Sequence, residues 1–99
     1  MIPGATPTHT FTVPVDTNII KALRITYSQG NSVVLQKTHE QCKMMDGEII
    51  CKLSQEDTLA FSDSGTVRVQ LKIKTDSGDV LISKIKSMPV QAVLEKEAI

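Results

Sequence analysis

The sequence lacks tryptophan, has one tyrosine and two phenylalanines as its only aromatic residues, and carries no excess of charge of either sign. Eleven Lys and Arg balance eleven Asp and Glu, so the chain as a whole creates no field that recruits nucleic acid, an anionic membrane or an acidic substrate. No apolar run approaches the ~20 residues that cross a bilayer. These absences argue against a nucleic-acid partner and against membrane insertion.

Cysteine is also scarce. Two residues cannot build the disulfide framework of a small secreted protein. Residues 1–7, Met-Ile-Pro-Gly-Ala-Thr-Pro, have neither the basic segment nor the apolar segment of a secretory signal. We therefore expect a protein that is cytoplasmic when synthesised. The length predicts a single domain, 1–99, with residues 1–7 as an extended arm and residues 95–99 as a frayed tail.

What the chain does have is alternation, most clearly in residues 66–75. Its apolar positions are Val67, Val69, Leu71 and Ile73, and its polar positions are Arg68, Gln70, Lys72 and Lys74. A period of two with β-branched residues on the apolar side predicts a strand with one buried face and one face in water. Such strands belong to antiparallel sheets, so the fold class we expect is all-β.

Shorter segments repeat this pattern along the chain. We expect strands at about 8–13, 20–28, 32–38, both arms of 42–53, 66–75, 80–88 and 90–94. Seven to eight short strands at about ten-residue spacing are typical of a β-sandwich or a small barrel. Within 80–88 the parity of the apolar residues shifts, and a bulge near Ser83-Lys84 would bring Val80, Ile82 and Ile85 to one face.

Two hairpins allow a prediction of register. For residues 20–38 we favour a three-residue loop, Gln29-Gly30-Asn31, because an odd loop places Tyr27 and Ile25 on the same side as Val33 and Leu35. A two-residue Gly-Asn turn would instead pair Ile25 with Gln36, and we reject it for that reason.

The hairpin at residues 42–53 has Asp46-Gly47, the preferred pair for a type I′ turn. Counting outward pairs Met45 with Glu48, Met44 with Ile49, Lys43 with Ile50 and Cys42 with Cys51. The side chains expected inside are Cys42, Met44, Ile49, Cys51 and Leu53. For the cysteine pair we favour two reduced, buried thiols over a cross-strand disulfide or a metal site.

One helical turn is expected, at residues 54–61. Ser54 followed by Asp57 resembles a capping box, with Asp as the shorter variant of the usual Glu. Leu59 and Phe61 would then plug one end of the core.

Candidate catalytic and metal-binding groups are isolated from one another. His9 and His39 have no neighbouring nucleophile or orienting carboxylate, and His9 shares parity with Phe11, which favours a partly buried structural histidine. The acidic pairs fall in expected turns, without calcium-loop spacing, and no phosphate-binding loop or nucleophile elbow appears. We expect no enzyme activity, no cofactor and no metal site.

One surface remains as a candidate for binding. Arg68, Gln70, Lys72 and Lys74 form an outward row, and Lys84 and Lys86 lie on the strand expected to pair with it. Binding to single-stranded nucleic acid usually requires exposed aromatic side chains, which this row lacks. We favour a solvated face, because lysines also protect strand edges from pairing with other chains, and keep a binding patch as the alternative.

Four segments resemble a known family. They are G-A-T-P-T-H-T-F-T-V-P at 4–14, I-K-A-L-R-I-T-Y-S-Q-G at 20–30, L-S-Q-E-D-T-L-A-F at 53–61 and V-R-V-Q-L-K at 67–72. The family is one of uncharacterised proteins of roughly one hundred residues encoded by phages and prophages of Firmicutes. Such proteins are similar, more loosely, to the immunoglobulin-like amino-terminal domain of phage baseplate upper proteins. The resemblance supplies no binding or catalytic residue.

The resemblance implies an immunoglobulin-like antiparallel β-sandwich of about seven strands with one short helical turn, and a structural role in a virion. We therefore expect a non-enzymatic structural or assembly protein of the tail or baseplate type. Its partners would be other virion proteins or further copies of itself, and its second location would be the virion. The alternative is a small ligand-binding module, for example for a host cell-surface polymer.

Overall fold

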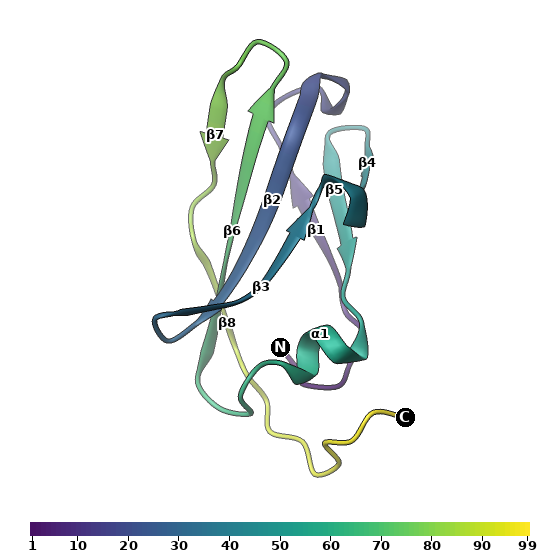
Figure 1. Cartoon of the computed structure of the whole chain (residues 1–99), viewed down its shortest axis with the longest axis vertical. Helices are drawn as coiled ribbons and strands as arrows, with labels where there is room; N and C mark the ends of the chain where they lie inside the picture. Colours follow the sequence, from purple (N-terminus) through teal and green to yellow (C-terminus); the bar gives the residue numbers. More distant parts are fainter.

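The computed structural model describes residues 1–99 and is an all-β sandwich of two antiparallel sheets (Figure 1). The first sheet has the order β1-β5-β4 and consists of β1 (Thr8–Thr12), β4 (Lys43–Met45) and β5 (Glu48–Lys52). The second has the order β3-β2-β6-β7, with β8 also paired to β6. Its strands are β2 (Ile20–Gln29), β3 (Ser32–Thr38), β6 (Thr66–Thr75), β7 (Val80–Ile82) and β8 (Lys86–Pro89). The helices are the 3₁₀ turns η1 (Thr17–Ile19) and η2 (His39–Gln41), and α1 (Gln55–Leu59).

The strand order is that of an immunoglobulin domain without its first strand. In such domains strands B, E and D share one sheet, while C, F and G share the other, extended by C′ in variable-type domains. Taking β1 as B gives B-E-D for the first sheet and C′-C-F-G for the second. The predicted immunoglobulin-like sandwich is therefore confirmed, with the irregular residues 1–7 preceding the first strand.

The core lies between the sheets and follows the predicted alternation. In β6, Val67, Val69, Leu71 and Ile73 are at most 5% exposed. From β2, Tyr27 reaches the same interior, where its ring meets the edge of Phe61 at a centroid distance of 6.2 Å. The predicted orientation of the β6 residues is confirmed, and it sends their polar neighbours to the opposite face of the sheet.

The β2–β3 hairpin corrects one prediction. Gln29 pairs with Ser32, so the turn is the two-residue Gly30-Asn31 that we rejected. Only Gly30 has a positive φ, of 62°, which fits a turn with glycine at its first central position. Next to the pair Ser28–Val33, the register shifts by one residue at a β-bulge, and Tyr27 pairs with Leu35. From there on, odd-numbered residues again lie opposite odd-numbered residues, as we predicted.

The same bulge turns Val33 away from the core. We expected Val33 on the inner side, but its side chain is 61% exposed, while Val34 and Leu35 are the residues of β3 that pack against the core. The prediction that odd-numbered residues pair with one another is confirmed. The predicted turn is wrong, and Tyr27 pairs two residues further along β3 than that turn would place it.

The β4–β5 hairpin agrees with the prediction. Met45 pairs with Glu48, and the turn residues Asp46 and Gly47 both have positive φ, of 51° and 78°, as a type I′ turn requires. Cys42 lies just before β4 rather than within it.

The predicted strand 80–88 is divided. β7 and β8 both pair with β6 and are separated by Ser83–Ile85. Across this connection the register with β6 shifts by one residue. This shift lies at the position of the bulge predicted near Ser83-Lys84. The last predicted strand, 90–94, is wrong: after Val90, whose amide donates to the Gly65 carbonyl, residues 91–99 form no strand.

The end of the sandwich near α1 is closed by hydrogen bonds. The capping box is confirmed, since the Ser54 amide donates to Asp57 (2.9 Å) and the Asp57 amide donates to the Ser54 hydroxyl (3.1 Å). The fully buried Thr58 hydroxyl donates to the Ala5 carbonyl (2.8 Å) and accepts from the Gly4 amide (2.9 Å). These last two bonds attach the irregular residues 1–7 to α1.

Candidate functional site

The predicted row on β6 lies on the outer face of the five-stranded sheet. Arg68, Lys72 and Lys74 are exposed there. Gln70 is half-buried, and its amide donates to the Ser83 carbonyl at 2.9 Å. Three members of the row are thus available to a partner, whereas Gln70 holds the β7–β8 connection against β6.

The neighbouring strand β2 adds a fourth cation. Arg24 is the direct cross-strand partner of Lys72, and Ala22 is the partner of Lys74. Directly opposed residues of an antiparallel pair project on the same face, and like charges in that position destabilise the pair. The two salt bridges of the molecule join Lys37 to Asp57 and Lys96 to Asp63, so neither neutralises Arg24 or Lys72.

Charge is strongly divided between parts of this neutral chain. The strands of the five-stranded sheet contain seven of the eleven Lys and Arg and none of the eleven Asp and Glu. The seven are Lys21, Arg24, Lys37, Arg68, Lys72, Lys74 and Lys86. A net charge of zero therefore conceals a cationic sheet, and the sequence-based exclusion of charged partners does not hold locally.

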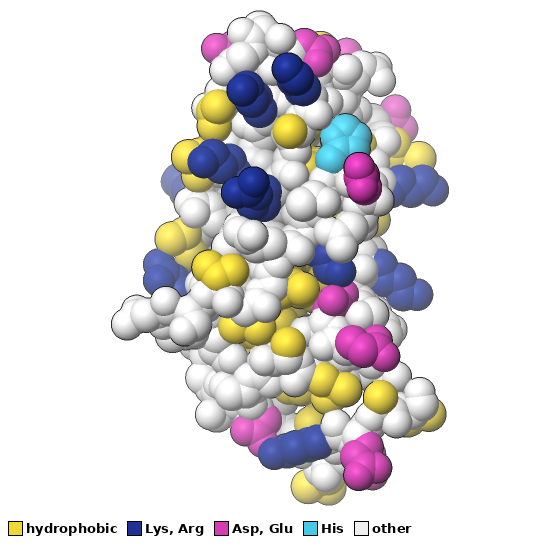
Figure 2. Space-filling view, in the orientation of Figure 1, with side chains coloured by type: hydrophobic (Ala, Val, Ile, Leu, Met, Phe, Trp, Pro, Cys, Tyr) yellow, Lys and Arg dark blue, Asp and Glu magenta, His cyan; other side chains and the backbone are white.

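Apolar side chains lie beside these cations. Val80, Ile82 and Ile85 are 48%, 59% and 48% exposed. Ile82 and Val80 are paired with Lys72 and Lys74, so they share the outer face. Figure 2 shows Lys and Arg side chains gathered over β2, β6 and β7 with hydrophobic side chains at their margin.

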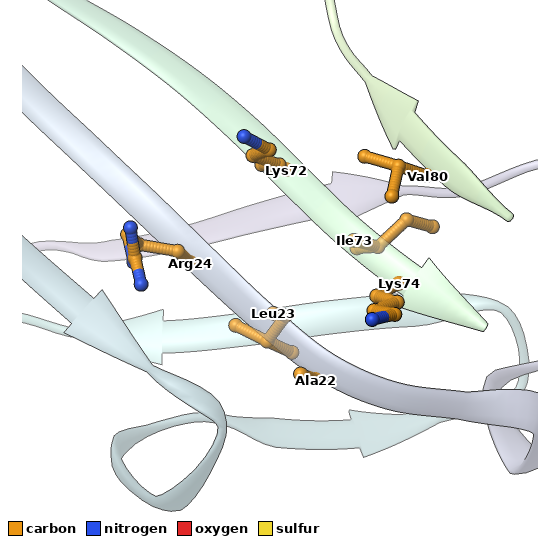
Figure 3. A pocket seen from close by; sticks show the side chains of 7 residues that line it. All are labelled: Ala22, Leu23, Arg24, Lys72, Ile73, Lys74 and Val80. Atoms are coloured by element: carbon orange, nitrogen blue, oxygen red, sulfur yellow. The ribbon is translucent and has the colours of Figure 1, made fainter. Parts of the chain in front are cut away.

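A shallow hollow of about 200 Å³ lies within this surface. Arg24, Lys72 and Lys74 surround it, Ala22 leaves it open because its side chain is short, and Val80 stands at the β7 edge (Figure 3). We call the residues Arg24, Arg68, Lys72, Lys74, Val80, Ile82 and Ile85 the cationic face.

A second depression lies on the inner side of β7. It is a groove of about 240 Å³ between the sheets, lined on one side by Val13 and Pro14 after β1 and on the other by Leu71, Ile73 and Leu81. Leu81 is 37% exposed because no strand lies beyond β7.

The other predicted basic residues do not extend the row. Lys86 pairs with Val69, whose side chain is buried, so Lys86 projects toward the inner side of the sheet. Lys84 lies in the connection between β7 and β8.

The two cysteines are free thiols near one another. Burial and the neighbouring Cys42 raise the pKa of Cys51 to about 12, and burial raises the pKa of Cys42. Both thiols are therefore held in the protonated form, which is the less reactive one. The free thiols agree with the reduced pair that we favoured, but only Cys51 is buried and Cys42 is partly exposed.

His9 packs against the core tyrosine. Its Nδ1 lies 2.6 Å from the Tyr27 hydroxyl, and the rings are 5.6 Å apart. Burial, with positive charges that include Lys86, lowers the pKa of His9, and burial raises the pKa of Tyr27. The neutral imidazole and the Tyr27 hydroxyl therefore share a hydrogen bond, and the prediction of a partly buried structural histidine is confirmed.

Sequence reasoning missed the apolar half of the cationic face. Within β7 the sequence has three successive apolar residues, Val80, Leu81 and Ile82, so no alternation indicates which side faces water. Sequence reasoning also left Arg24 out of the basic row, and for this cation a signal was available: residues 20–38 and 66–75 contain no acidic residue.

Comparison of the chain with protein-family models, curated proteins and solved structures finds no match. No group of three or more His, Cys, Asp and Glu side chains is placed to hold a metal ion. None of the helices has the length and apolar character needed to cross a membrane.

Proposed function

We propose that this chain is a non-enzymatic, phage-derived structural or assembly protein that acts through protein–protein contacts made by its cationic face. The observation that carries the proposal is the pairing of Arg24 with Lys72 on an exposed sheet that has no acidic side chain in its strands. Its phage origin, and a tail or baseplate role, are supported by the sequence resemblance of residues 4–14, 20–30, 53–61 and 67–72.

The energetics favour a partner with acidic groups. Opposed like charges on neighbouring strands cost a few tenths of a kcal/mol up to ~1 kcal/mol. A carboxylate placed between Arg24 and Lys72 removes this cost and forms charge-assisted hydrogen bonds. Val80, Ile82 and Ile85 supply apolar surface next to the cations, so a partner that neutralises the charges also buries apolar area beside them.

Particles made after prophage induction test this function. In the bacterium that encodes the chain, we expect the protein to co-purify with mature particles or with tail and capsid assembly intermediates. The double variant Lys72→Glu, Lys74→Glu should lose this association. The matched control is Lys43→Glu, Lys52→Glu, which reverses two exposed lysines on the other sheet. Absence of the wild-type protein from all of these fractions would overturn the proposal.

One observation favours a second function, a module that binds a host cell-surface polymer. The hollow of about 200 Å³ has three cations around it and suits a chain of phosphodiesters better than a neutral sugar, which stacks on aromatic side chains. A glycerol-phosphate polymer should then bind in a salt-dependent manner. Unchanged binding by the variant Arg68→Glu, Lys72→Glu would exclude this second function.

A further inference from the structure

The hydrogen bonds between β6 and β7 show which main-chain groups the free edge of β7 exposes. The Thr75 amide donates to the Asp79 carbonyl (2.9 Å), and the Ser83 amide donates to the Leu71 carbonyl (2.8 Å). In an antiparallel ladder, hydrogen-bonded and non-hydrogen-bonded pairs alternate. The pair between these two, Ile73 with Leu81, is therefore also hydrogen-bonded, and the main chain of Leu81 faces β6.

It follows that the main chains of Val80 and Ile82 face outward. Their amides and carbonyls have no strand beside them, because β7 ends the sheet. None of its three residues is a proline, a lysine or an acidic residue, so β7 lacks the side chains that commonly protect an edge. β7 thus offers two donors and two acceptors in a row, flanked by exposed apolar side chains.

We propose that this edge pairs with β7 of a second copy of the chain, in antiparallel orientation, with a two-fold axis at Leu81. Val80 then pairs with Ile82 of the second copy, and Ile82 pairs with its Val80. Each of these two pairs exchanges two main-chain hydrogen bonds, so four bonds join the copies. The result is one continuous sheet across the dimer.

The side chains fit this register. Leu81 of each copy meets its counterpart in a non-hydrogen-bonded pair, the closer of the two types, and covers the open side of the groove. Asp79 lies opposite Ser83 of the second copy. A two-fold axis at Val80 or at Ile82 would instead oppose apolar residues to Asp79 or to Lys84, so the sequence selects the axis at Leu81.

The cations do not oppose the pairing. In the joined sheet, Lys72 of one copy and Lys74 of the other are separated by three strand spacings, roughly 14 Å. This exceeds the Debye length of ~8 Å at physiological ionic strength. The paired segment is short, so we expect a weak dimer, with a dissociation constant on the order of 0.1–1 mM.

This inference goes beyond the proposed function, because it concerns contact between copies through the main chain of β7. Sedimentation velocity of the full chain from micromolar to millimolar concentrations should show a monomer–dimer equilibrium. Hydrogen exchange followed by NMR should show protection of the Val80 and Ile82 amides that increases with concentration. The Leu81 amide, already bonded to β6, should be protected throughout.

Two variants and one matched control test the edge. Ile82→Pro removes an outward donor without removing a bond to β6, and proline is accepted at such edge positions. Ile82→Lys keeps the main-chain donor and places a charge at the contact between the copies. If the proline variant does not fold, Ile82→Lys still tests whether β7 forms the dimer. Each should weaken dimerisation at least tenfold. Val33→Lys changes a residue of equal exposure, 61% against 59%, on the opposite edge strand and should leave the dimer unchanged.

The outcomes are distinct from those of the proposed function. Lys72→Glu, Lys74→Glu should leave the dimer intact while it abolishes association with particles. A wild-type chain that stays monomeric at millimolar concentration would overturn the inference. So would a dimer that survives Ile82→Lys, or one that forms without added protection at Val80 and Ile82.

Discussion

The α1 end of the sandwich and the β7 edge are built in opposite ways. At the α1 end the buried polar side chains are paired: Thr58 holds residues 1–7, and Asp57 caps the helix and binds Lys37 of β3 at 2.8 Å. At the β7 edge, three successive apolar side chains are 37–59% exposed, and the main chains of Val80 and Ile82 have no strand beside them.

The difference separates residues that hold the fold from residues available to partners. Buried, mutually satisfied groups are costly to change, because removal of one partner leaves the other unpaired in a dry site. Exposed apolar residues contribute little to the stability of the fold, and their apolar surface remains available for burial against a partner. We therefore expect substitutions at the α1 end to change stability and those at the β7 edge to change association.

The largest effect is expected for Phe61→Ala. Phe61 is 4% exposed and packs edge-to-face on Tyr27, so truncation removes the stacking contact and leaves a cavity. The free energy of unfolding should fall by about 3–5 kcal/mol, measured by urea denaturation. The same measurement on Ile82→Ala, at a residue 59% exposed, should give a change within about 0.5 kcal/mol. Comparable losses in the two variants would remove the distinction between the regions.

A somewhat smaller loss is expected for Thr58→Val, which keeps the shape of the side chain and removes its hydroxyl. The Ala5 carbonyl and the Gly4 amide both lose their partner. The cost should be about 2–3 kcal/mol of unfolding free energy. Thr10→Val, at an exposed position of β1, is the matched control. If both variants cost equally little, residues 1–7 are not fixed by Thr58.

The sequence predicted the stable region better than the open one. At the α1 end the signals are local, since Ser54 and Asp57 are three residues apart and determine the capping box by themselves. The burial of Thr58 could not be predicted in this way, because its partners lie 53 and 54 residues away in sequence.

The errors share one physical cause, which is that parity does not determine register. In the β2–β3 hairpin, a two-residue turn followed by a bulge gives the same parity as a three-residue loop, but it exposes Val33. In β7, the apolar run has no alternation, so only pairing with β6 shows that Val80 and Ile82 face outward. Three of the four cations of the site were predictable from the alternation of β6, whereas Arg24 of β2 and the apolar residues were not predicted.

The ion pair between the sheet and α1 should give a smaller effect. Burial would raise the pKa of Asp57, but hydrogen bonds from Lys37 and from the Ser54 amide hold it below its ordinary value. Asp57→Asn keeps an acceptor for Ser54 and removes the charge. We expect a loss of about 1–2 kcal/mol, between the values for exposed and buried pairs, because the side chains are 12% and 16% exposed.

A double-mutant cycle with Lys37→Met isolates this pair. If the cation and the carboxylate interact as the structure shows, the cost of Asp57→Asn should be much smaller when Lys37 is already replaced. Because the pKa of Asp57 is lowered, its contribution is present above the unfolded value of 3.8 and is lost as the pH falls below it. Equal costs in both backgrounds would show that the two groups do not couple.

The smallest effect that we predict is a pH dependence due to His9. Its pKa is lowered in the folded chain by burial and by nearby positive charge, so unfolding takes up a proton once the pH falls below the ordinary value of 6.5. The contribution of His9 to stability is therefore complete above that pH and is lost as the pH falls through the folded value.

His9→Asn retains an uncharged polar group beside Tyr27 and should remove this part of the pH dependence, as urea denaturation between neutral and mildly acidic pH will show. His39→Asn, at an exposed site, should keep the wild-type dependence. If the His9 variant also keeps the wild-type pH dependence, the loss of stability in acid is due to groups other than His9.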